Sequence, residues 1–332
     1  MTPLLDISVV IPTVDRRERL LALLRALVRS THSVREVLVV DAGTQKLSGA
    51  DLEALAPLPV RCLDAPRSVC VQRNAGIHAA SSRWIFLCDD DIEVPADHLA
   101  RLAAHAALHP EAGALSGLVL EDHGRGWTGE FPETSSAVVV WKHLFQLGMW
   151  GAIRARRPPA RWIAERCQRR GNHISKAGWP VITQMDGPYF RTPIYALGAS
   201  LIRRDWLLAS PFDEILDSHG LGDNYGVAIG FPPEGIHVLT DAPVRHHRAP
   251  ENRLPDGLAR EQRLLALDYF IRSRRQFAGV SRRWFLWSLV GGAVMHSLSG
   301  NTSVARSYRR ALLRAASGDN PYLRVSATRK SA

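Results

Sequence analysis

The sequence predicts an α/β fold with a mainly parallel central sheet, flanked by helices and followed by C-terminal helices. Short apolar runs alternate with amphipathic stretches through the first 120 residues. These runs are apolar throughout, as in strands that are covered on both faces. The chain has 332 residues, of which 46% are hydrophobic, so it can bury one large core.

The strands are predicted from β-branched and apolar runs. The first runs from Ile7 to Ile11 and is closed by Pro12. The next strands are expected over residues 36–40, 60–63, 84–88 and 114–120, and a small-residue run predicts a further strand over residues 196–202.

The helices are predicted from apolar residues that recur on one face. Residues 16–30 place Leu20, Leu24 and Leu27 on such a face, and Pro95 suits the first turn of a helix over residues 95–109. The other helices are expected over residues 68–80, 260–277 and 282–298. Residues 121–185 show weak patterns, and we expect helices and loops there that shape an acceptor cleft.

The formal net charge of +10 is concentrated toward the C-terminus. From Arg245 onward there are 17 basic and 5 acidic residues, whereas the first 244 residues carry 25 basic and 27 acidic ones. A second basic cluster lies between Arg154 and Lys176. This asymmetry indicates either an anionic partner, such as lipid headgroups or nucleic acid, or a solvated Arg-rich surface.

The cysteines and the N-terminal segment give an expectation for the cellular compartment of the protein. Cys62, Cys70, Cys88 and Cys167 show no CxxC pairing, and Cys62 and Cys88 fall in strand-like runs where free thiols are commonly buried. The N-terminus lacks the basic and apolar segments of a secretory signal. We therefore expect a reducing cytoplasmic location and no zinc site.

Polar residues follow three of the predicted strands. Thr13 follows the first strand, Asp41 the second, and Asp89-Asp90-Asp91 the fourth. Ligands of parallel sheets bind at the carboxyl ends of the strands, so these groups are expected at one edge. Adjacent carboxylates repel one another and need a cation. Mg²⁺ or Mn²⁺, bound jointly by these carboxylates and by substrate phosphates, would supply this cation. Alternatively, the three aspartates cap a helix or lie in a solvated turn.

Two further features suit a nucleotide at the same edge. Asp41 could accept a hydrogen bond from a base imide or a ribose, although an ordinary turn aspartate is the alternative. Arg73 and Asn74 lie at a helix start, where a guanidinium and backbone N–H groups suit a diphosphate.

Four motifs then occur in order: Ile-Ser-Val-Val-Ile-Pro-Thr, Val-Val-Asp-Ala-Gly-Thr, Arg-Asn-Ala-Gly-Ile and Phe-Leu-Cys-Asp-Asp-Asp-Ile-Glu-Val-Pro. This series resembles the family 2 glycosyltransferases, which have the GT-A nucleotide-diphospho-sugar transferase fold. The resemblance covers residues 6–120 well and 196–248 more loosely. It implies a catalytic domain over 1–250, with a nucleotide-binding half (1–120) and an acceptor-binding half (121–250), and leaves a basic helical region over 251–332.

The resemblance also implies site residues. The nucleotide-sugar-binding residues would be Pro12, Thr13, Asp15, Asp41, Arg73, Asp89 and Asp90. The ligands of Mg²⁺ or Mn²⁺ would be Asp91, Asp89 and His246. Among these, Asp41 would read the base and Asp89 the ribose, with the division among the three aspartates open. His246 or His247 would approach the metal, or both would lie in a basic surface loop.

Inverting members of the family place a catalytic aspartate late in the domain, and Asp223 occupies the matching place. It would act as the general base on the acceptor hydroxyl while the metal stabilises charge on the β-phosphate. Gly222 stands where the family often has Glu, and Ala42 replaces the second acid of Val-Asp-Asp-Gly. These departures leave Asp213, Glu214 and Asp217 as alternative bases.

Residues 284–298 are uncharged but shorter than the ~20 apolar residues that a spanning helix needs. The preceding Arg282 and Arg283 suit a helix lying on an anionic bilayer. A helix packed on the catalytic domain is the alternative. We therefore expect a cytoplasmic protein, at most peripheral at the inner face of the membrane.

The expected partners are a nucleotide-diphosphate-sugar donor, a glycan, lipid-linked or small-molecule acceptor, and an anionic membrane surface. One alternative is a metal-dependent nucleotidyltransferase, which would normally carry a Gly-rich basic loop where this chain has residues 12–15. The other is a basic scaffold that binds nucleic acid or membrane without catalysis. Because the acidic cluster would repel a phosphate backbone, we expect no nucleic acid.

Overall fold

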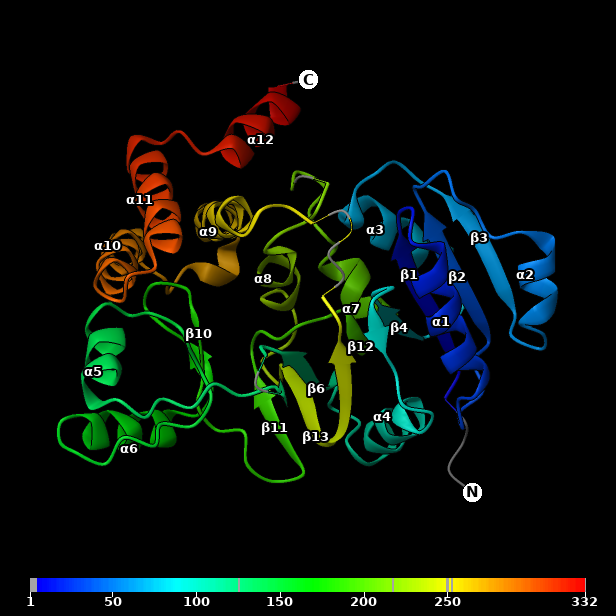
Figure 1. The fold of residues 1–332 in the computed structure, drawn as a ribbon, viewed down its shortest axis with the longest axis horizontal. Coiled ribbons are helices and arrows are strands. Elements are labelled where there is room, and N and C mark those ends of the chain that lie inside the picture. Colours follow the sequence, from blue (N-terminus) through cyan, green and yellow to red (C-terminus); the bar gives the residue numbers. More distant parts are fainter. Residues whose placement is uncertain (1–4, 125, 217, 249–250, 252, 332) are drawn as a thin grey trace.

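A mixed sheet forms the centre of the computed structural model, which describes residues 5–124, 126–216, 218–248, 251 and 253–331 (Figure 1). Along the sheet, the strands are β11 (Tyr189–Thr192), β13 (Ile236–His246), β6 (Ala114–Asp122), β12 (Ala199–Arg203), β4 (Trp84–Cys88), β1 (Ile7–Thr13), β2 (Glu36–Asp41) and β3 (Val60–Asp64). Two short strands join its side: β5 (Ile92–Glu93) pairs with β13, and β7 (Trp127–Thr128) pairs with β6.

The predicted parallel sheet is confirmed for the first four strands. β1 pairs in parallel with both β2 and β4, and β2 with β3. β12 then runs antiparallel between β4 and β6, while β13 runs parallel to β6. The carboxyl ends of β1, β2 and β4 therefore share one edge. All strands predicted from the sequence are present, but β13 was not among them.

Helices cover both faces of the sheet because the strand side chains alternate between two cores. One face of β1 and β2 packs against α1 (Arg17–Val28) and α4 (His98–Leu108). The opposite face packs against α3 (Val69–Ala79) and α7 (Arg204–Ala209). The short helix α2 (Gly49–Ala54) precedes the edge strand β3.

The edge position of β3 corrects one expectation from the sequence. Cys62 lies in this strand and is exposed, whereas Cys70, Cys88 and Cys167 are buried. Because β3 is the last strand of the sheet, it has a neighbouring strand on one side alone and Cys62 stays exposed, which a strand-like run by itself does not reveal.

Residues 133–185 form an accessory unit beside the main sheet. It contains α5 (Ser136–Leu144), α6 (Ala160–Arg170) and a small sheet of β8 (Met149–Trp150), β10 (Pro180–Ile182) and β9 (His173–Ile174). A separate apolar cluster, which includes Val139, Ile163 and Val181, holds this unit together. The helices fit the expectation for this region, and the small sheet was not predicted.

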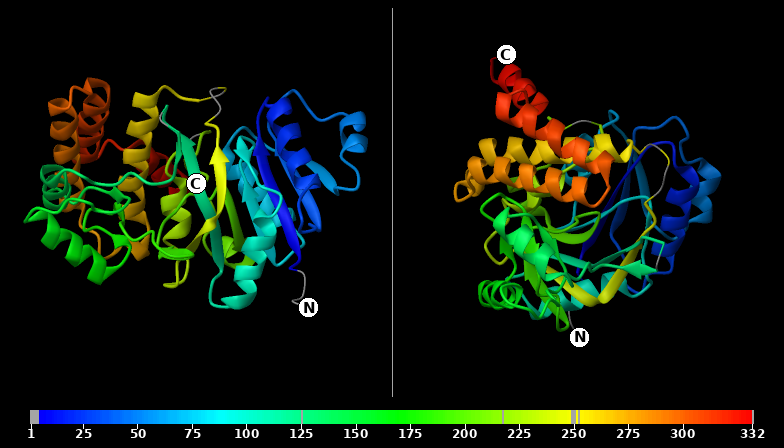
Figure 2. Two further views of the ribbon diagram at one scale, coloured as in Figure 1. Left: turned by 60° about the horizontal axis from the view of Figure 1, so that its bottom comes forward. Right: turned by 60° about the vertical axis from the view of Figure 1, so that its left-hand side comes forward.

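The C-terminal helices lie at the opposite end of the molecule from β2, β3 and α2 (Figures 1 and 2). They are α9 (Asp256–Ser273), the 3₁₀ helix η1 (Arg275–Phe277), α10 (Arg282–Leu298), α11 (Thr302–Ser317) and α12 (Pro321–Ser331). The core of α9 is continuous with that of α8 (Asp223–Ala228), since Phe270 and Val227 belong to the same buried cluster. The division at residue 250 remains a prediction.

The uncharged segment 284–298 belongs to α10, which packs on other parts of the chain. Gly291 lies against the ring of Phe145, the residue that follows α5, where an added Cβ would come within 2.2 Å of Cγ. Trp141 of α5 donates a hydrogen bond to the Gly291 carbonyl at 3.0 Å. This geometry agrees with the packed-helix alternative. Among the described residues, none of the helices has the length and apolarity needed to cross a bilayer.

Candidate active site

The ends of β1 and β4 are joined by a buried aspartate. Thr13 donates a hydrogen bond from Oγ1 to Oδ2 of Asp90 at 2.7 Å, and Arg16 donates to the other carboxylate oxygen at 2.8 Å. Burial raises the pKa of Asp90 to about 6, although Arg16 and Thr13 oppose the shift. Because both carboxylate oxygens already have protein partners, Asp90 positions the two strand ends.

Arg73 connects two acidic residues that are far apart in sequence. Its Nη2 donates to Oδ1 of Asp89 at 2.6 Å, and its Nη1 donates to Oδ2 of Asp223. The guanidinium is buried, and its pKa is raised by the two carboxylates against the effect of burial. Arg73 therefore brings Asp223 to the end of β4, as the predicted general base requires.

Asp223 reaches this place because its loop is fixed to the helix that carries Arg73. The backbone N–H of Val69, at the start of α3, donates to the carbonyl of Ser218 at 3.1 Å. Asp223 is the first residue of α8, and its Oδ1 accepts the N–H of Asn224 at 2.7 Å. Burial raises the pKa of Asp223, and Arg73 partly offsets this rise. The side chain is 9% exposed.

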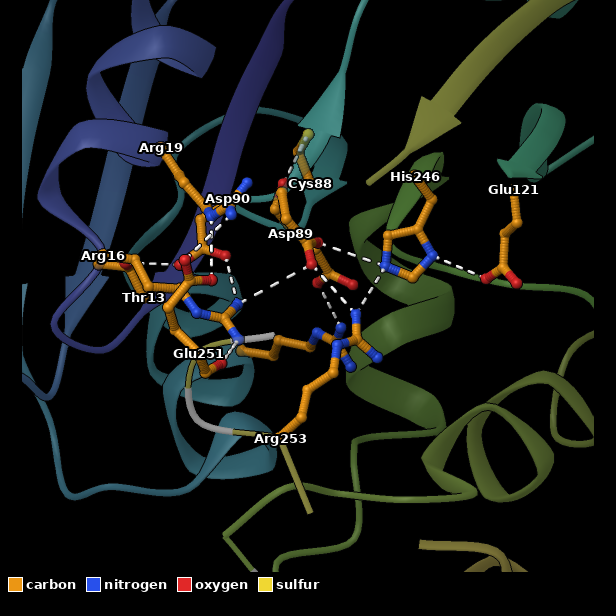
Figure 3. Close-up of polar contacts among 12 residues, drawn as sticks. Thr13, Arg16, Arg19, Cys88, Asp89, Asp90, Glu121, His246, Glu251 and Arg253 are labelled. Carbon is orange, nitrogen blue, oxygen red and sulfur yellow. Dashed lines mark hydrogen bonds and ion pairs between the residues drawn. The ribbon is translucent and has the colours of Figure 1, made fainter. Parts of the chain in front are cut away.

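Asp91 faces a histidine that the antiparallel pairing of β5 and β13 brings beside it. His246 pairs in register with Ile92, and its Nε2 lies 3.3 Å from Oδ1 of Asp91. On the other side of the ring, Nδ1 lies 2.9 Å from Oε1 of Glu121, at the end of β6. Figure 3 shows His246 between Glu121 and the acidic residues after β4. Although burial opposes it, hydrogen bonds to Asp91 and Glu121 raise the pKa of His246 to about 9.

An arginine from beyond β13 also lies beside Asp91. Nη2 of Arg253 lies 3.2 Å from Oδ2 of Asp91. The neighbouring Glu251 pairs with Arg19 of α1 at 3.1 Å, and its carbonyl accepts a hydrogen bond from Arg16. His247 takes a different direction, since its Nε2 lies 3.0 Å from Glu93. Of the two predicted histidines, the structure places His246 at the acidic cluster.

The remaining nucleotide-site predictions lie around the ends of β1 and β2. Pro12 is buried within β1, and Thr13 is the register partner of Asp41. Oδ1 of Asp41 accepts the N–H of Gly43 at 2.7 Å. Asp15 caps the same turn, and its Oδ1 accepts the N–H of Thr44 at 2.6 Å. These backbone hydrogen bonds hold the pKa of Asp15 below its usual value.

The turn after β2 fits so closely against Asp15 that it requires glycine. A Cβ on Gly43 would lie 2.5 Å from the backbone N of Asp15 and 2.6 Å from its Oδ1. Gln72 of α3 joins the two strands by donating hydrogen bonds to the carbonyls of Thr13 and Val40, at 2.8 and 2.7 Å. Asp15, Asp41 and the three adjacent aspartates are therefore held at one rim.

The residues around Asp91 offer some of the ligands that a divalent metal needs. Asp91 and His246 offer oxygen and nitrogen ligands that Mn²⁺ accepts, and the Glu121 carboxylate fixes the imidazole as outer carboxylates do in metal sites. Among the described residues, no three His, Cys, Asp or Glu side chains form a ready-made metal site. Asp89 is instead paired with Arg73. The residues thus fit an open site that needs substrate oxygens to complete it.

Two of the alternative bases have other roles. Oδ2 of Asp213 accepts a hydrogen bond from Tyr269 at 2.8 Å and lies 3.2 Å from Arg274, so this carboxylate anchors α9. Glu214 accepts a hydrogen bond from Asn74 at 2.9 Å. Asp217 lies outside the described residues.

Sequence reasoning missed Arg16, Gln72, Glu121 and Arg253. Glu121 could have been found, because it follows a predicted strand just as Asp41 and Asp89 do. Arg253 could not, since its contact with Asp91 spans 162 residues and depends on the path of the chain after β13.

Residues 8–150 match the family model described as glycosyl transferase family 2. An uncharacterised glycosyltransferase, YwdF of Bacillus subtilis (strain 168), is 34% identical over 100 residues, which are 30% of this chain and 37% of YwdF. The chain thus spans well under half the length of this curated relative.

Solved structures show the same fold at low identity. TarS residues 1–349 of S. aureus, in complex with UDP, has a TM-score of 0.52 at 14% identity, covering 95% of this chain and 92% of TarS. GalNAc-T7 with UDP, GalNAc and Mn²⁺ has a TM-score of 0.53 at 15% identity, covering 89% of this chain and 58% of GalNAc-T7. The chain has the GT-A glycosyltransferase fold, and its residues 8–150 are similar to glycosyl transferase family 2.

Proposed function

We propose that this chain is a metal-dependent inverting glycosyltransferase that moves a sugar from a nucleotide-diphosphate sugar to an acceptor hydroxyl. The observation that carries the proposal is the Arg73 bridge between Asp89 and Asp223. This bridge joins Asp89, at the end of β4, to Asp223, which lies 134 positions later in the chain. Asp91 and His246 lie beside them. The family match and the shared fold support a glycosyltransferase.

In this proposal Asp223 is the general base. Its carboxylate takes the proton of the acceptor hydroxyl while that oxygen forms a bond to the anomeric carbon. The bond from the anomeric carbon to the β-phosphate oxygen breaks at the same time, and the nucleoside diphosphate leaves with the electron pair. Burial raises the pKa of Asp223, which makes it a stronger base, and Arg73 holds it in place.

Asp91 and His246 would hold Mg²⁺ or Mn²⁺ together with diphosphate oxygens of the donor. When bound, the ion would neutralise negative charge on the departing diphosphate. Asp91 is paired with His246 and Arg253 in this structure, so binding of the ion would require His246 to lose its proton, and the ion would replace these cations as the partner of Asp91. Asp15 and Asp41 keep the turn after β2 in place, and this turn forms the nucleotide side of the site.

The experiment is a donor-hydrolysis assay, since water can replace an unidentified acceptor. A panel of UDP-, GDP- and dTDP-sugars is incubated with Mn²⁺, with Mg²⁺ and with EDTA, and nucleoside diphosphate release is measured. The proposal expects release from at least one donor, dependent on metal and lost in Asp91→Asn. Asp122→Asn, which removes an exposed carboxylate at the end of β6, is the matched control and should keep full activity.

The same assay separates the other functional classes. A nucleotidyltransferase would form or cleave the nucleotide at its α-phosphate and release pyrophosphate or a nucleoside monophosphate instead. A non-catalytic scaffold would release nothing from any donor. The acceptor, whether glycan, lipid-linked or small molecule, and the cytoplasmic location are further parts of the proposal.

A further inference from the structure

The accessory unit contains a cavity of about 100 Å³ away from the residues of the candidate active site. Its lining combines α5, α6 and the segment around β9. A volume of this size is large enough for several waters or a phosphate-sized group, since one water needs roughly 10–15 Å³ on this measure. The cavity has its own set of residues, so its ligand is argued independently of the proposed reaction.

The charged side chains that line the cavity are all basic: Lys142, Arg166, Arg170 and Lys176. Lys142 forms an ion pair with Glu133, and the Lys176 ammonium lies 5.5 Å from the ring centre of Trp284. Within the described part of the chain, Arg166 and Arg170 have no ion pair with a carboxylate. The cavity therefore holds two guanidinium groups whose charge is not balanced locally.

Two histidines in the lining respond to this positive charge. Burial lowers the pKa of His143, and Arg166 and Lys176 lower it further. Burial also lowers the pKa of His173, and Arg170 and Arg166 add to the shift. The positive electrostatic potential of this cavity favours the binding of an anion.

A shallow apolar groove of about 400 Å³ adjoins the cavity. It is lined by Val140, Leu144, Pro159, Trp162 and Ile163, and it shares His143 and Arg166 with the cavity. Leu144 is 55% exposed and Trp162 58% exposed, so two large apolar side chains face solvent beside a basic pocket. Tryptophan and arginine in this arrangement suit the boundary between lipid headgroups and hydrocarbon.

We infer that the cavity and the groove together form a binding site for a phosphate-bearing lipid. Arg166 and Arg170 hold the phosphate, because guanidinium groups pair with phosphate oxygens through directed hydrogen bonds. The hydrocarbon chain lies along Leu144 and Trp162, which removes their apolar surface from water. The basic cavity complements the negative charge of a phosphate, and the cavity and the groove share His143 and Arg166. These two observations favour a phosphate-bearing lipid over a wholly apolar ligand.

The test is co-sedimentation of the full chain with phosphatidylcholine vesicles that contain phosphatidic acid. The double variant R166Q/R170Q should bind at least about 30-fold more weakly, because it loses the directed hydrogen bonds to the phosphate in addition to roughly one kcal/mol of surface attraction for each basic residue. The matched control R161Q/R169Q removes the same charge from other positions of α6, so it loses the surface attraction alone and should weaken binding at least about threefold less than R166Q/R170Q does. The variant L144S/W162S should also lose binding. The control L313S, which changes an exposed leucine of α11 away from the groove, should keep it.

Three outcomes would overturn the inference. Equal losses in the two arginine pairs would show a general charge effect without a site. Undiminished binding of L144S/W162S would show that no hydrocarbon chain occupies the groove. Saturable binding of inorganic phosphate that vesicles do not compete for would assign the cavity to a soluble anion. Circular dichroism and the melting temperature of each variant confirm folding, so that a loss of binding reports on the site.

Discussion

Replacing Asp223 with asparagine tests the proposed general base. The substitution keeps the shape of the side chain and one oxygen that accepts a hydrogen bond from Arg73, but it removes the proton-accepting carboxylate. General-base catalysis contributes about 10²- to 10⁴-fold. We therefore expect turnover of a sugar nucleotide in the presence of its acceptor to fall by this factor, equal to about 3–5 kcal/mol of activation free energy.

The effect on folding is expected to be smaller. Removing one partner of a buried ion pair costs about 3–5 kcal/mol when the other charge is left unpaired. Here Arg73 keeps Asp89 at 2.6 Å, and the asparagine still accepts a hydrogen bond. The expected loss of unfolding free energy is therefore about 1–3 kcal/mol, which lowers the melting temperature by several degrees.

The assay measures turnover and nucleoside diphosphate affinity on the same preparation. Affinity should change little, because Asp223 contacts the acceptor in this scheme. The matched control is Asp213→Asn, which removes a carboxylate that anchors α9 through Tyr269 and Arg274. It should lose stability but keep activity within about threefold. An Asp223→Asn protein with more than a tenth of wild-type turnover would refute the general-base assignment.

Three other perturbations test separate parts of the structure. Glu121→Gln weakens the hydrogen bond that holds the His246 ring in place. The apparent Mn²⁺ affinity in the hydrolysis assay should therefore fall about 10- to 100-fold, whereas the hydrolysis rate at saturating Mn²⁺ should fall much less. Gly43→Ala would place a Cβ against Asp15 and should raise the KM for the sugar nucleotide, whereas Gly49→Ala, which meets nothing within 4 Å, should not. Burial lowers the pKa of His237 to about 4, so the unfolded chain takes up a proton near pH 6.5 while the folded state does not. Stability to urea should therefore fall from pH 7 to pH 5, with a smaller fall in His237→Asn; an unchanged pH dependence in that variant would contradict the assignment.

The first 120 residues were predictable because each local signal agreed with the fold. The apolar runs at β1, β2 and β4 bury both faces, and the residues after them must then share an edge. The same logic predicted that Asp89 and Asp91 lie together. The order of motifs predicted the place of Asp223, and the structure brings it within reach of Asp89 through Arg73.

The second half was less predictable because its contacts are distant in sequence. β13 contains Thr240, Asp241 and Pro243, which interrupt the apolar pattern, and its register with β6 shifts at this point. The position of His246 depends on this strand. The accessory unit depends on very short strands and a small core, and neither leaves a clear periodicity.

In the proposed function, the rim around Asp91 binds a divalent ion together with a diphosphate. It is tested most directly by the melting temperature of the protein with UDP or GDP, with and without Mn²⁺, in wild type and Asp91→Asn. A ligand at 100 times its Kd stabilises the folded state by about 2.7 kcal/mol. We expect the melting temperature to rise by several degrees with at least one nucleotide, and we expect this rise to require Mn²⁺ and to be absent in Asp91→Asn. An equal rise in EDTA, or one that persists in Asp91→Asn, would contradict it.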